Sequence, residues 1–247
     1  MDWQDEAVIL TVAKHGETSV IADVLTPSHG RHRGLIRGGT GTRQRGVLQP
    51  GNKVRADWRA RLSEHLGAFQ IELDTSYAAA LMTQPVKLAA MSSLCAVAGA
   101  TLPEREPHPE IYAASLAVLD LLADDGCSAM DAGVAIVRWE LALLAVLGFG
   151  LDLSACAVTG VTEGLIYVSP RSARAVSAAG AGDYADRLMP LPAFLMGGES
   201  ATQVSDLNDG LTLTGFFIER HILHPIDRQL PQARTRFADT VQALDAA

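Results

Sequence analysis

Residues 53–62 have the sequence KVRADWRARL, in which charged and apolar side chains alternate strictly. Successive side chains of a β-strand point to opposite faces of a sheet, so this alternation predicts a half-buried strand. Its inner face would carry Val54, Trp58 and Leu62, whereas its outer face would carry arginines and a single acidic residue, Asp57. The stretch therefore predicts a strand with one packed side and one basic side.

Four further stretches of strand character lie with it in the first 76 residues. They span residues 7–12, 19–25, 31–37 and 68–73. Turns containing glycine, proline or serine separate the stretches at short intervals, which is typical of a small closed barrel. The OB-fold is the natural five-stranded candidate. The glycine-rich residues 38–46 are expected to form a loop within it.

Helical sequence replaces strand sequence after residue 75. Pro85 and Pro109 suit the first turn of a helix, where the missing N–H of proline costs nothing. Residues 164–178 return briefly to strand character and predict a small hairpin. The expected helices span residues 86–100, 110–123, 131–147 and 205–223.

These elements predict an α+β fold in two parts. A five-stranded barrel domain is expected over residues 1–76. A mainly helical domain with the small hairpin inserted is expected over residues 77–247. The change from a period of two to a helical period near residue 76 is the basis for this boundary.

Charge is distributed very unevenly along the chain. The formal net charge is −8, yet residues 31–61 alone carry +8, because nine basic residues face only Asp57. Charges of one sign on a small barrel indicate an anionic partner, and the phosphates of a nucleic acid fit best. An acidic protein partner is the alternative. The nine candidate DNA-binding residues are Arg31, Arg33, Arg37, Arg43, Arg45, Lys53, Arg55, Arg59 and Arg61.

Aromatic residues hardly interleave with this basic stretch. Trp58 faces the predicted core, and Phe69 is expected to face it as well. Stacking platforms for bases are therefore not expected. Binding should depend on the charge of the phosphate backbone and not on the base sequence.

Motifs for catalysis or for a cofactor are missing from the sequence. Residues 39–46 lack the third glycine of a dinucleotide-binding fingerprint, and Val47 and Leu48 stand where a P-loop needs lysine and serine or threonine. His221 and His224 have no third ligand nearby in the sequence, and the three cysteines form no CxxC pair. We therefore expect a protein that is not an enzyme and that binds no cofactor or metal.

The sequence also indicates where in the cell the protein is expected to be found. The acidic N-terminus lacks the features of a signal peptide. Residues 132–151 are almost wholly apolar, but Arg138 and Glu140 at their centre would each cost roughly 2.5–3.5 kcal/mol in a bilayer. A buried helix of a cytoplasmic protein is the expected interpretation.

Arg138 and Glu140 pose a further question within that helix. Residues two apart on a helix point about 200° away from each other, so the two charges cannot share a face. A buried charge needs a partner, which makes an internal ion pair one interpretation. The other is an apolar groove with Arg138 at its lip, suited to a peptide that carries a carboxylate and a hydrophobic end.

The order and spacing of several motifs resemble the RecO family of bacterial recombination mediators over essentially the whole chain. The most specific motif is RWELALL at residues 138–144, followed by LGFG at residues 147–150 and by Cys156. LPQAR follows at residues 230–234. The N-terminal motifs are GETS at 16–19, ADVLT at 22–26, HGR at 29–31 and GVLQPG at 46–51.

The resemblance implies an N-terminal OB-fold, a helical domain and a small zinc-ribbon-like element over residues 152–180. It also implies that the protein binds single- and double-stranded DNA, anneals complementary strands and helps RecA to load onto strands coated by single-strand-binding protein. The implied partners are RecR and the acidic, hydrophobic C-terminal tail of the single-strand-binding protein. The implied location is the cytoplasm, in association with the nucleoid.

Two details of the resemblance concern single residues. The implied tail has the chemistry of the groove considered above, which favours the peptide interpretation, with Arg138, Leu141 and Arg234 as the candidate contacts. Some family members hold zinc with four cysteines, whereas here only Cys156 lies in the zinc-ribbon-like element. We therefore expect its hairpin to be held by packing without a metal.

Overall fold

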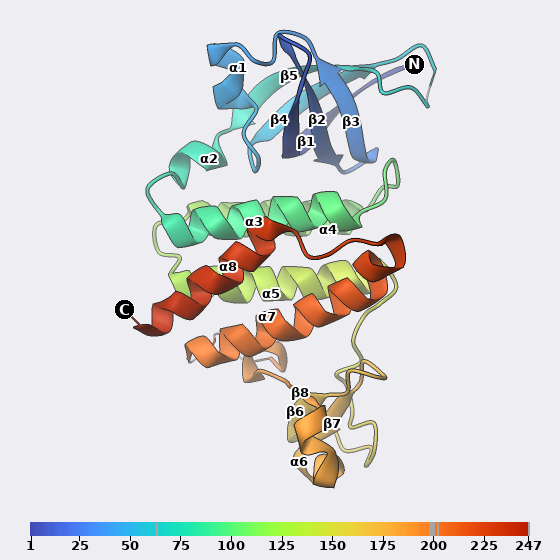
Figure 1. Cartoon of the computed structure of the whole chain (residues 1–247), viewed down its shortest axis with the longest axis vertical. Coiled ribbons are helices and arrows are strands. Elements are labelled where there is room, and N and C mark those ends of the chain that lie inside the picture. Colours follow the sequence, from blue (N-terminus) through green and yellow to red (C-terminus); the bar gives the residue numbers. More distant parts are fainter. Residues whose placement is uncertain (63, 198–200, 202, 247) are drawn as a thin grey trace. The chain divides into compact units, whose positions relative to one another are not determined.

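The computed structural model describes residues 1–62, 64–197, 201 and 203–246 of the chain. The chain divides into two compact units, Met1–Cys127 and Ser128–Ala247. Figure 1 labels the strands and helices of both units. The fold is α+β, as the sequence predicts.

Unit 1 begins with a closed barrel of five strands in the order β1-β2-β3-β5-β4. Neighbouring strands are antiparallel except β3 and β5, which pair in parallel at Leu35 and Ala68. This closed ring confirms the expected five-stranded OB-fold. The strands are β1 (Asp2–His15), β2 (Ser19–Thr26), β3 (Gly30–Ile36), β4 (Lys53–Arg59) and β5 (Ala68–Thr75).

The long first strand allows the barrel to close. Its first half pairs with β4 and its second half pairs with β2, and Val8 has a partner on both sides, Lys53 and Leu25. The pairing with β2 is irregular between Ile9 and Thr11, which is the signature of a β-bulge. A bulge bends a strand, so one strand can serve two neighbours that diverge.

The barrel core contains the inward residues that alternation predicts, with one exception. Val54 and Trp58 of β4 are buried beside Phe69 of β5. Leu62, by contrast, is 51% exposed, and the prediction that it faces the core is wrong. Strand β4 ends at Arg59, and the chain then turns, with the His65 N–H donating to the Leu62 carbonyl, so the alternation stops before Leu62.

The predicted loop over residues 38–46 is also partly wrong, because it contains a short helix, α1 (Thr42–Val47). The Arg45 N–H donates to the Gly41 carbonyl and begins the helix. The side-chain amide nitrogen of Asn52 donates to the carbonyls of Gly46 and Val47 at the C-terminal end of this helix. Arg43 and Arg45 therefore lie on a helix and not in a flexible loop.

Helices α2 (Tyr77–Ala80), α3 (Pro85–Thr101) and α4 (Pro109–Ala123) complete unit 1. The two long ones begin at the two prolines that the sequence singles out. The buried Lys87 ammonium of α3 donates to the Asp124 carbonyl just beyond α4, and the Tyr77 hydroxyl donates to the Asp120 carboxylate. The boundary expected between residues 76 and 77 coincides with the end of the strands, whereas the compact units divide after Cys127.

Unit 2 is built on helices α5 (Ala129–Val146), α7 (Val204–Ile218) and α8 (Gln232–Gln242). A capping box between Ser128 and Asp131 begins α5, because each side chain bonds to the backbone N–H of the other. The expected hairpin is present as β6 (Leu165–Val168) and β7 (Ala175–Ser177), and β8 (Met189–Pro190) adds a third strand. The short helix α6 (Ala178–Ala181) follows β7 directly.

Helix α5 is the apolar helix that the sequence analysis considers as a membrane segment. Among the described residues, no helix is both long and apolar enough to span a bilayer. Glu140 at the centre of α5 is fully buried within unit 2, whereas Arg138 is exposed. One charge is buried and the other is exposed, which agrees with their position on different sides of the helix.

Candidate nucleic-acid and peptide interfaces

Arg31 on β3 is the most enclosed of the nine candidate DNA-binding residues, with 13% of its side chain exposed. Its Nε lies 3.1 Å from Asp23 Oδ2, and its Nη2 lies 3.2 Å from Glu104 Oε1. Burial raises the pKa of Asp23 to about 6, an effect that the positive charge of Arg31 opposes. The hydrogen-bonding capacity of Arg31 is therefore directed into unit 1, where it ties the barrel to the segment before α4.

Two more strand residues carry ion pairs at the surface. Arg33 Nη1 lies 3.7 Å from Glu104 Oε1. Lys53 Nζ lies 3.2 Å from Glu6 Oε2 and 3.3 Å from Asp74 Oδ2. Carboxylates from outside the basic stretch thus offset both cations locally.

Arg55 and Arg59 face acidic residues across the strands. Arg55 is in register with Glu6 on β1 and with Glu72 on β5. Arg59 is in register with Asp2 on β1. Opposite charges at facing positions attract, so the outer face of β4 is mixed in charge and not uniformly basic.

Three exposed candidate residues lie on α1 or shortly before it in sequence, and we call them the α1 basic cluster: Arg37, Arg43 and Arg45. Arg43 and Arg45 are two apart on α1, so they extend from different sides of this helix. All three are exposed, and among the described residues none has an acidic group within 4 Å. Arg45 Nε donates to the Thr40 carbonyl, which orients its guanidinium beside the turn between β3 and α1. In contrast to Arg55 and Arg59, the three residues of the cluster also have no acidic residue in register with them on a neighbouring strand of the described chain.

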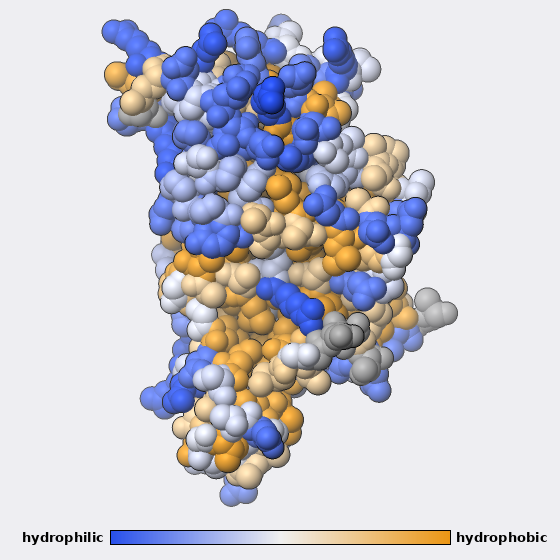
Figure 2. Space-filling view, turned by 180° about the vertical axis from the view of Figure 1, so that it is seen from behind, coloured by the Kyte–Doolittle hydropathy of each residue, from blue (hydrophilic) through white to orange (hydrophobic). Residues whose placement is uncertain are grey.

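A hollow of about 430 Å³ lies next to the cluster. Lys14 and Arg45 line it together with Glu17, its one acidic residue. Lys14 lies outside the basic stretch in sequence and joins it only through the β1–β2 pairing. Figure 2 shows hydrophilic residues over most of the barrel surface, at the top of that view.

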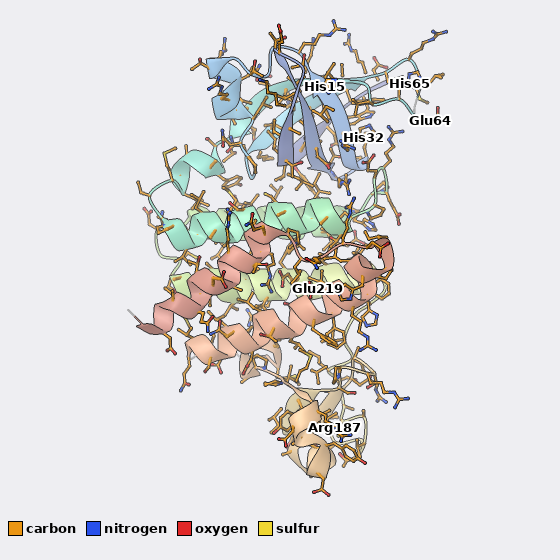
Figure 3. The ribbon with its side chains drawn as sticks, in the orientation of Figure 1. His15, His32, Glu64, His65, Arg187 and Glu219 are labelled. Atoms are coloured by element: carbon orange, nitrogen blue, oxygen red, sulfur yellow. The ribbon has the colours of Figure 1, made fainter. Side chains whose placement is uncertain are left out.

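The loop between β4 and β5 carries another basic group. Arg61 is exposed there, and Glu64 and His65 follow it in the same loop (Figure 3). Arg105, from the segment between α3 and α4, donates from Nη2 to the His65 carbonyl at 2.9 Å. Sequence reasoning missed Arg105, because only the fold brings residue 105 to this loop.

Sequence reasoning also missed a cluster of aromatic rings at the barrel wall. Trp3 stacks on His29, with ring centroids 4.2 Å apart and an interplanar angle of 8°. Trp3 also stacks on Trp58 at 5.8 Å and 18°. His32, on β3 (Figure 3), lies edge-to-face against both tryptophans, and Phe69 lies edge-to-face against Trp3. Aromatic residues far apart in sequence meet here through strand pairing.

His32 at the centre of this cluster is buried, with 4% of the residue exposed. Neither of its ring nitrogens has a hydrogen-bond partner among the described residues. Burial and the nearby charge of Arg105 lower the pKa of His32 to about 4. The ring is therefore neutral near pH 7, and it packs nearly perpendicular to the two tryptophan rings.

The three candidate peptide-binding residues do not come together in unit 2. Arg138 is exposed on α5, and its Nη2 donates to the Phe194 carbonyl at 3.0 Å. Leu141 is half-buried one turn further along α5. Arg234 on α8 is buried, with 2% exposed, so its side chain is not presented to a peptide as the sequence analysis expects.

Arg234 instead forms the internal ion pair with Glu140. Its Nη2 donates to Glu140 Oε2 at 3.0 Å and to the Leu211 carbonyl at 2.7 Å. The Thr214 hydroxyl donates to the same carboxylate, so donors from α7 and α8 surround a charge on α5. The buried charge that the sequence analysis considers is thus matched by Arg234, and Arg138 is left at the surface.

Cys156 in the hairpin region has an unusual environment. Its Sγ accepts hydrogen bonds from the Ser177 N–H at 3.2 Å, the Ser177 hydroxyl at 3.4 Å and the Thr159 N–H at 3.4 Å. These donors, the Ser177 hydroxyl first, lower the pKa of the thiol to about 6. Three residues lie against Cys156: Thr159, Ser177 and Gly180. Positions 156, 159, 177 and 180 have the spacing of two CxxC pairs, as in a four-cysteine metal site, but only position 156 is a cysteine.

The described residues contain no group of three or more histidine, cysteine, aspartate or glutamate side chains placed to hold a metal ion. The zinc-ribbon-like character of the element and the predicted lack of zinc both stay predictions. The donor set around Cys156 offers one thiol and two hydroxyls, which is a poor match to the thiolate and imidazole ligands that zinc prefers.

A closed OB-fold barrel that carries exposed basic residues is an architecture found among nucleic-acid-binding proteins. The sequence comparisons agree. The family "Recombination protein O N terminal" matches residues 1–77, and "Recombination protein O C terminal" matches residues 82–229. The chain belongs to the RecO family.

Similar proteins share nearly the full length of this chain. "DNA repair protein RecO" of Rhodospirillum centenum is 48% identical over 241 residues, which are 97% of this chain and 94% of the relative. That of Rhodospirillum rubrum is 46% identical over 250 residues, which are 100% and 99%. That of Ruegeria sp. is 45% identical over 242 residues, which are 98% of each. The chain therefore has a role in DNA repair and recombination.

Proposed function

We propose that this protein is a recombination mediator that binds single- and double-stranded DNA and anneals complementary strands. With RecR, it helps RecA to load onto strands coated by single-strand-binding protein. It acts in the cytoplasm, in association with the nucleoid, and it catalyses no covalent reaction. Membership of the RecO family supports the role, and no group of clustered carboxylates among the described residues suggests a phosphoryl-transfer site.

The observation that carries the DNA-binding part is the α1 basic cluster. Its three arginines are exposed, are close in sequence and have no acidic group within 4 Å among the described residues. Cations of this kind bind phosphates and release the counterions of DNA, whereas a cation already paired with a carboxylate releases few. Arg31 and Lys53, which lie on strands, are cations already paired with carboxylates.

A salt titration of DNA affinity tests this proposal. If the three arginines and Lys14 each neutralise one phosphate, four contacts give a slope of roughly −2.8 in log K against log salt for single strands. The affinity should then fall about 50-fold between 50 and 200 mM salt. Failure of the pure protein to bind 30-mer strands of either kind at 50 mM salt would exclude the proposal.

The alternative function is a protein-only adaptor whose basic barrel face docks an acidic partner. The same titration separates the two, because an adaptor binds no free DNA at low salt. Annealing of complementary strands, followed by the quenching of a dye pair, tests the further step. Magnesium-dependent cleavage of DNA by pure protein would contradict the proposal that it is not an enzyme.

The second part of the proposal concerns the tail of the single-strand-binding protein. Its support in this chain is Arg138, an exposed guanidinium on α5, with the half-buried Leu141 on the same helix face one turn away. A peptide with a terminal carboxylate next to an apolar side chain could engage both. Arg234 has no direct part in this proposal, because Glu140 and the Leu211 carbonyl hold its guanidinium.

A further inference from the structure

The aromatic rings of the barrel form a ladder that runs from the core to the surface. Trp58 at its inner end is 2% exposed. Trp3 is the middle ring, nearly parallel to both neighbours, and His29 is the outer ring, with 33% of its side chain exposed. One face of the His29 ring rests on Trp3. The opposite face of the His29 ring is where a further flat ring would continue the ladder.

The inner and middle rings, Trp58 and Trp3, are held in place by their neighbours. The Trp58 indole N–H donates to the Leu66 carbonyl at 3.1 Å. Gly67 has a φ of +66°, and a Cβ built there would lie 2.4 Å from the Trp58 ring, so only glycine lets the backbone close over this ring. His32 buttresses both tryptophans from the side at 4.7 and 5.1 Å.

The outer ring is held in place as well. The His29 N–H donates to Thr26 Oγ1 at 3.0 Å, and its ring Nδ1 lies 3.1 Å from Asp5 Oδ2. Asp5 also accepts the backbone N–H groups of Ser28 and Glu6, so the carboxylate is fixed by the same turn. A ring that is already oriented loses little conformational freedom when another ring stacks on it.

The ladder adjoins a basic loop. Leu66 and Gly67, which contact Trp58, belong to the same β4–β5 loop as Arg61 and His65. Arg105 contacts the His65 carbonyl from the other side. The loop that closes over the inner end of the ladder therefore also carries an exposed cation, Arg61.

We propose that His29, supported by Trp3 and Trp58, is a stacking site for an unpaired nucleobase of single-stranded DNA. This inference rests on the proposed DNA-binding function and adds a contact that is specific to single strands. Bases in a duplex already stack on each other and present no free face, whereas a single strand can offer one to an aromatic ring. The α1 basic cluster, in contrast, meets phosphates that both kinds of DNA carry.

The test compares three variants with the wild-type protein on a 30-mer single strand and the matching duplex, by fluorescence anisotropy at fixed salt. His29→Ala should weaken single-strand binding about tenfold, within the range for loss of one stacked base. It should leave duplex binding within about twofold, and the salt slope should not change, because no ion pair to a phosphate is lost. His29→Phe keeps a flat ring without the imidazole nitrogens and should retain single-strand affinity.

Arg43→Ala is the matched control. It should weaken binding to both kinds of DNA and reduce the salt slope by about 0.7–0.9. Wild-type binding to a 30-mer with a run of abasic sites should be as weak as the binding of His29→Ala to normal DNA. Thermal melting of each variant shows that the fold is kept.

Two results would overturn the stacking site. One is a His29→Ala protein that binds single strands as well as wild type does. The other is a His29→Phe protein no better than His29→Ala, since the imidazole would then act through its nitrogens and not its face. If wild type itself binds neither DNA at low salt, the proposed function fails, and this outcome is distinct from both.

Discussion

The strands of the barrel and the α1 end of the barrel both carry basic residues, but the surroundings of these residues differ. On the strands, Arg31 and Lys53 are held by carboxylates that come from other parts of unit 1. In the α1 basic cluster, Arg43 and Arg45 have no such partners among the described residues. A count of charges along the sequence treats the two regions as one, whereas the fold separates structural cations from available ones.

Unit 2 repeats this contrast with two arginines. Arg234 is buried against Glu140, whereas Arg138 is exposed. In both units, the arginine that is enclosed by a carboxylate should matter for stability, and the exposed one should matter for binding.

The largest effect is expected from Arg234→Met. Among the described residues, this change leaves the buried Glu140 carboxylate with the Thr214 hydroxyl as its one remaining donor. Loss of one partner from a buried pair costs about 3–5 kcal/mol. Urea unfolding of the variant and wild type measures it. The double variant Glu140→Leu/Arg234→Met should recover much of the loss, because it removes both charges. A single variant as stable as wild type would show that Arg234 is not a structural cation.

The second prediction concerns the α1 basic cluster itself. Replacing Arg37, Arg43 and Arg45 together with alanine should weaken binding to single- and double-stranded DNA about 100-fold near 100 mM salt, because three phosphate contacts are lost. Stability should hardly change. The matched control is Arg33→Ala/Lys53→Ala, which removes two strand-borne cations with carboxylate partners and should weaken DNA binding far less. If the two variants lose DNA affinity equally, the distinction between the α1 basic cluster and the paired cations of the strands is wrong.

The third prediction uses pH to test the Arg31 region. Burial raises the pKa of Asp23 in the folded protein to about 6, above its ordinary value of 3.8. The folded state therefore binds the proton more tightly than the unfolded state, so the contribution of Asp23 to stability is full below pH 3.8 and is lost as the pH rises through 6. The loss is on the order of 2 kcal/mol. Unfolding of wild type and Asp23→Asn at several pH values measures this loss. The difference in unfolding free energy between the two proteins should change between pH 4 and pH 7.

A constant difference between wild type and Asp23→Asn over that range would show that Asp23 titrates normally. The Arg31–Asp23 pair would then be as well solvated as a surface pair. In that case Arg31 would belong with the available cations and not with the structural ones.

Much of the fold could be predicted from the sequence, because local patterns determine it. Alternation over residues 53–62 indicates β4, and Pro85 and Pro109 mark where α3 and α4 begin. The errors lie where a local pattern continues past the end of its element. Leu62 keeps the alternation after β4 has turned away, and residues 42–47 form a helix despite their glycine-rich surroundings.

The candidate site is harder to predict, because pairing across the barrel decides it. The local sequence around Arg31 does not predict its ion pair with Glu104. The local sequence around Trp58 does not predict its stacking with Trp3, or that of Trp3 with His29. The expectation that base-stacking platforms are absent concerns only the aromatics within the basic stretch, and Trp3 and His29 lie outside it. It stays a prediction, which the His29 variants test. In the fold, the rings come from β1, the β2–β3 turn and β4, which are adjacent only after the barrel closes.

The smallest change in stability is expected from Arg138→Ala. The side chain is exposed, so the free energy of unfolding should stay within about 0.5 kcal/mol of wild type, in contrast to Arg234→Met. Binding of an acidic peptide that ends in an apolar residue should nevertheless weaken several-fold, and isothermal titration measures this. DNA affinity, which we propose depends on unit 1, should not change. If Arg138→Ala instead destabilises the protein as much as Arg234→Met does, the Phe194 contact is structural, and the division between enclosed and available arginines does not extend to α5.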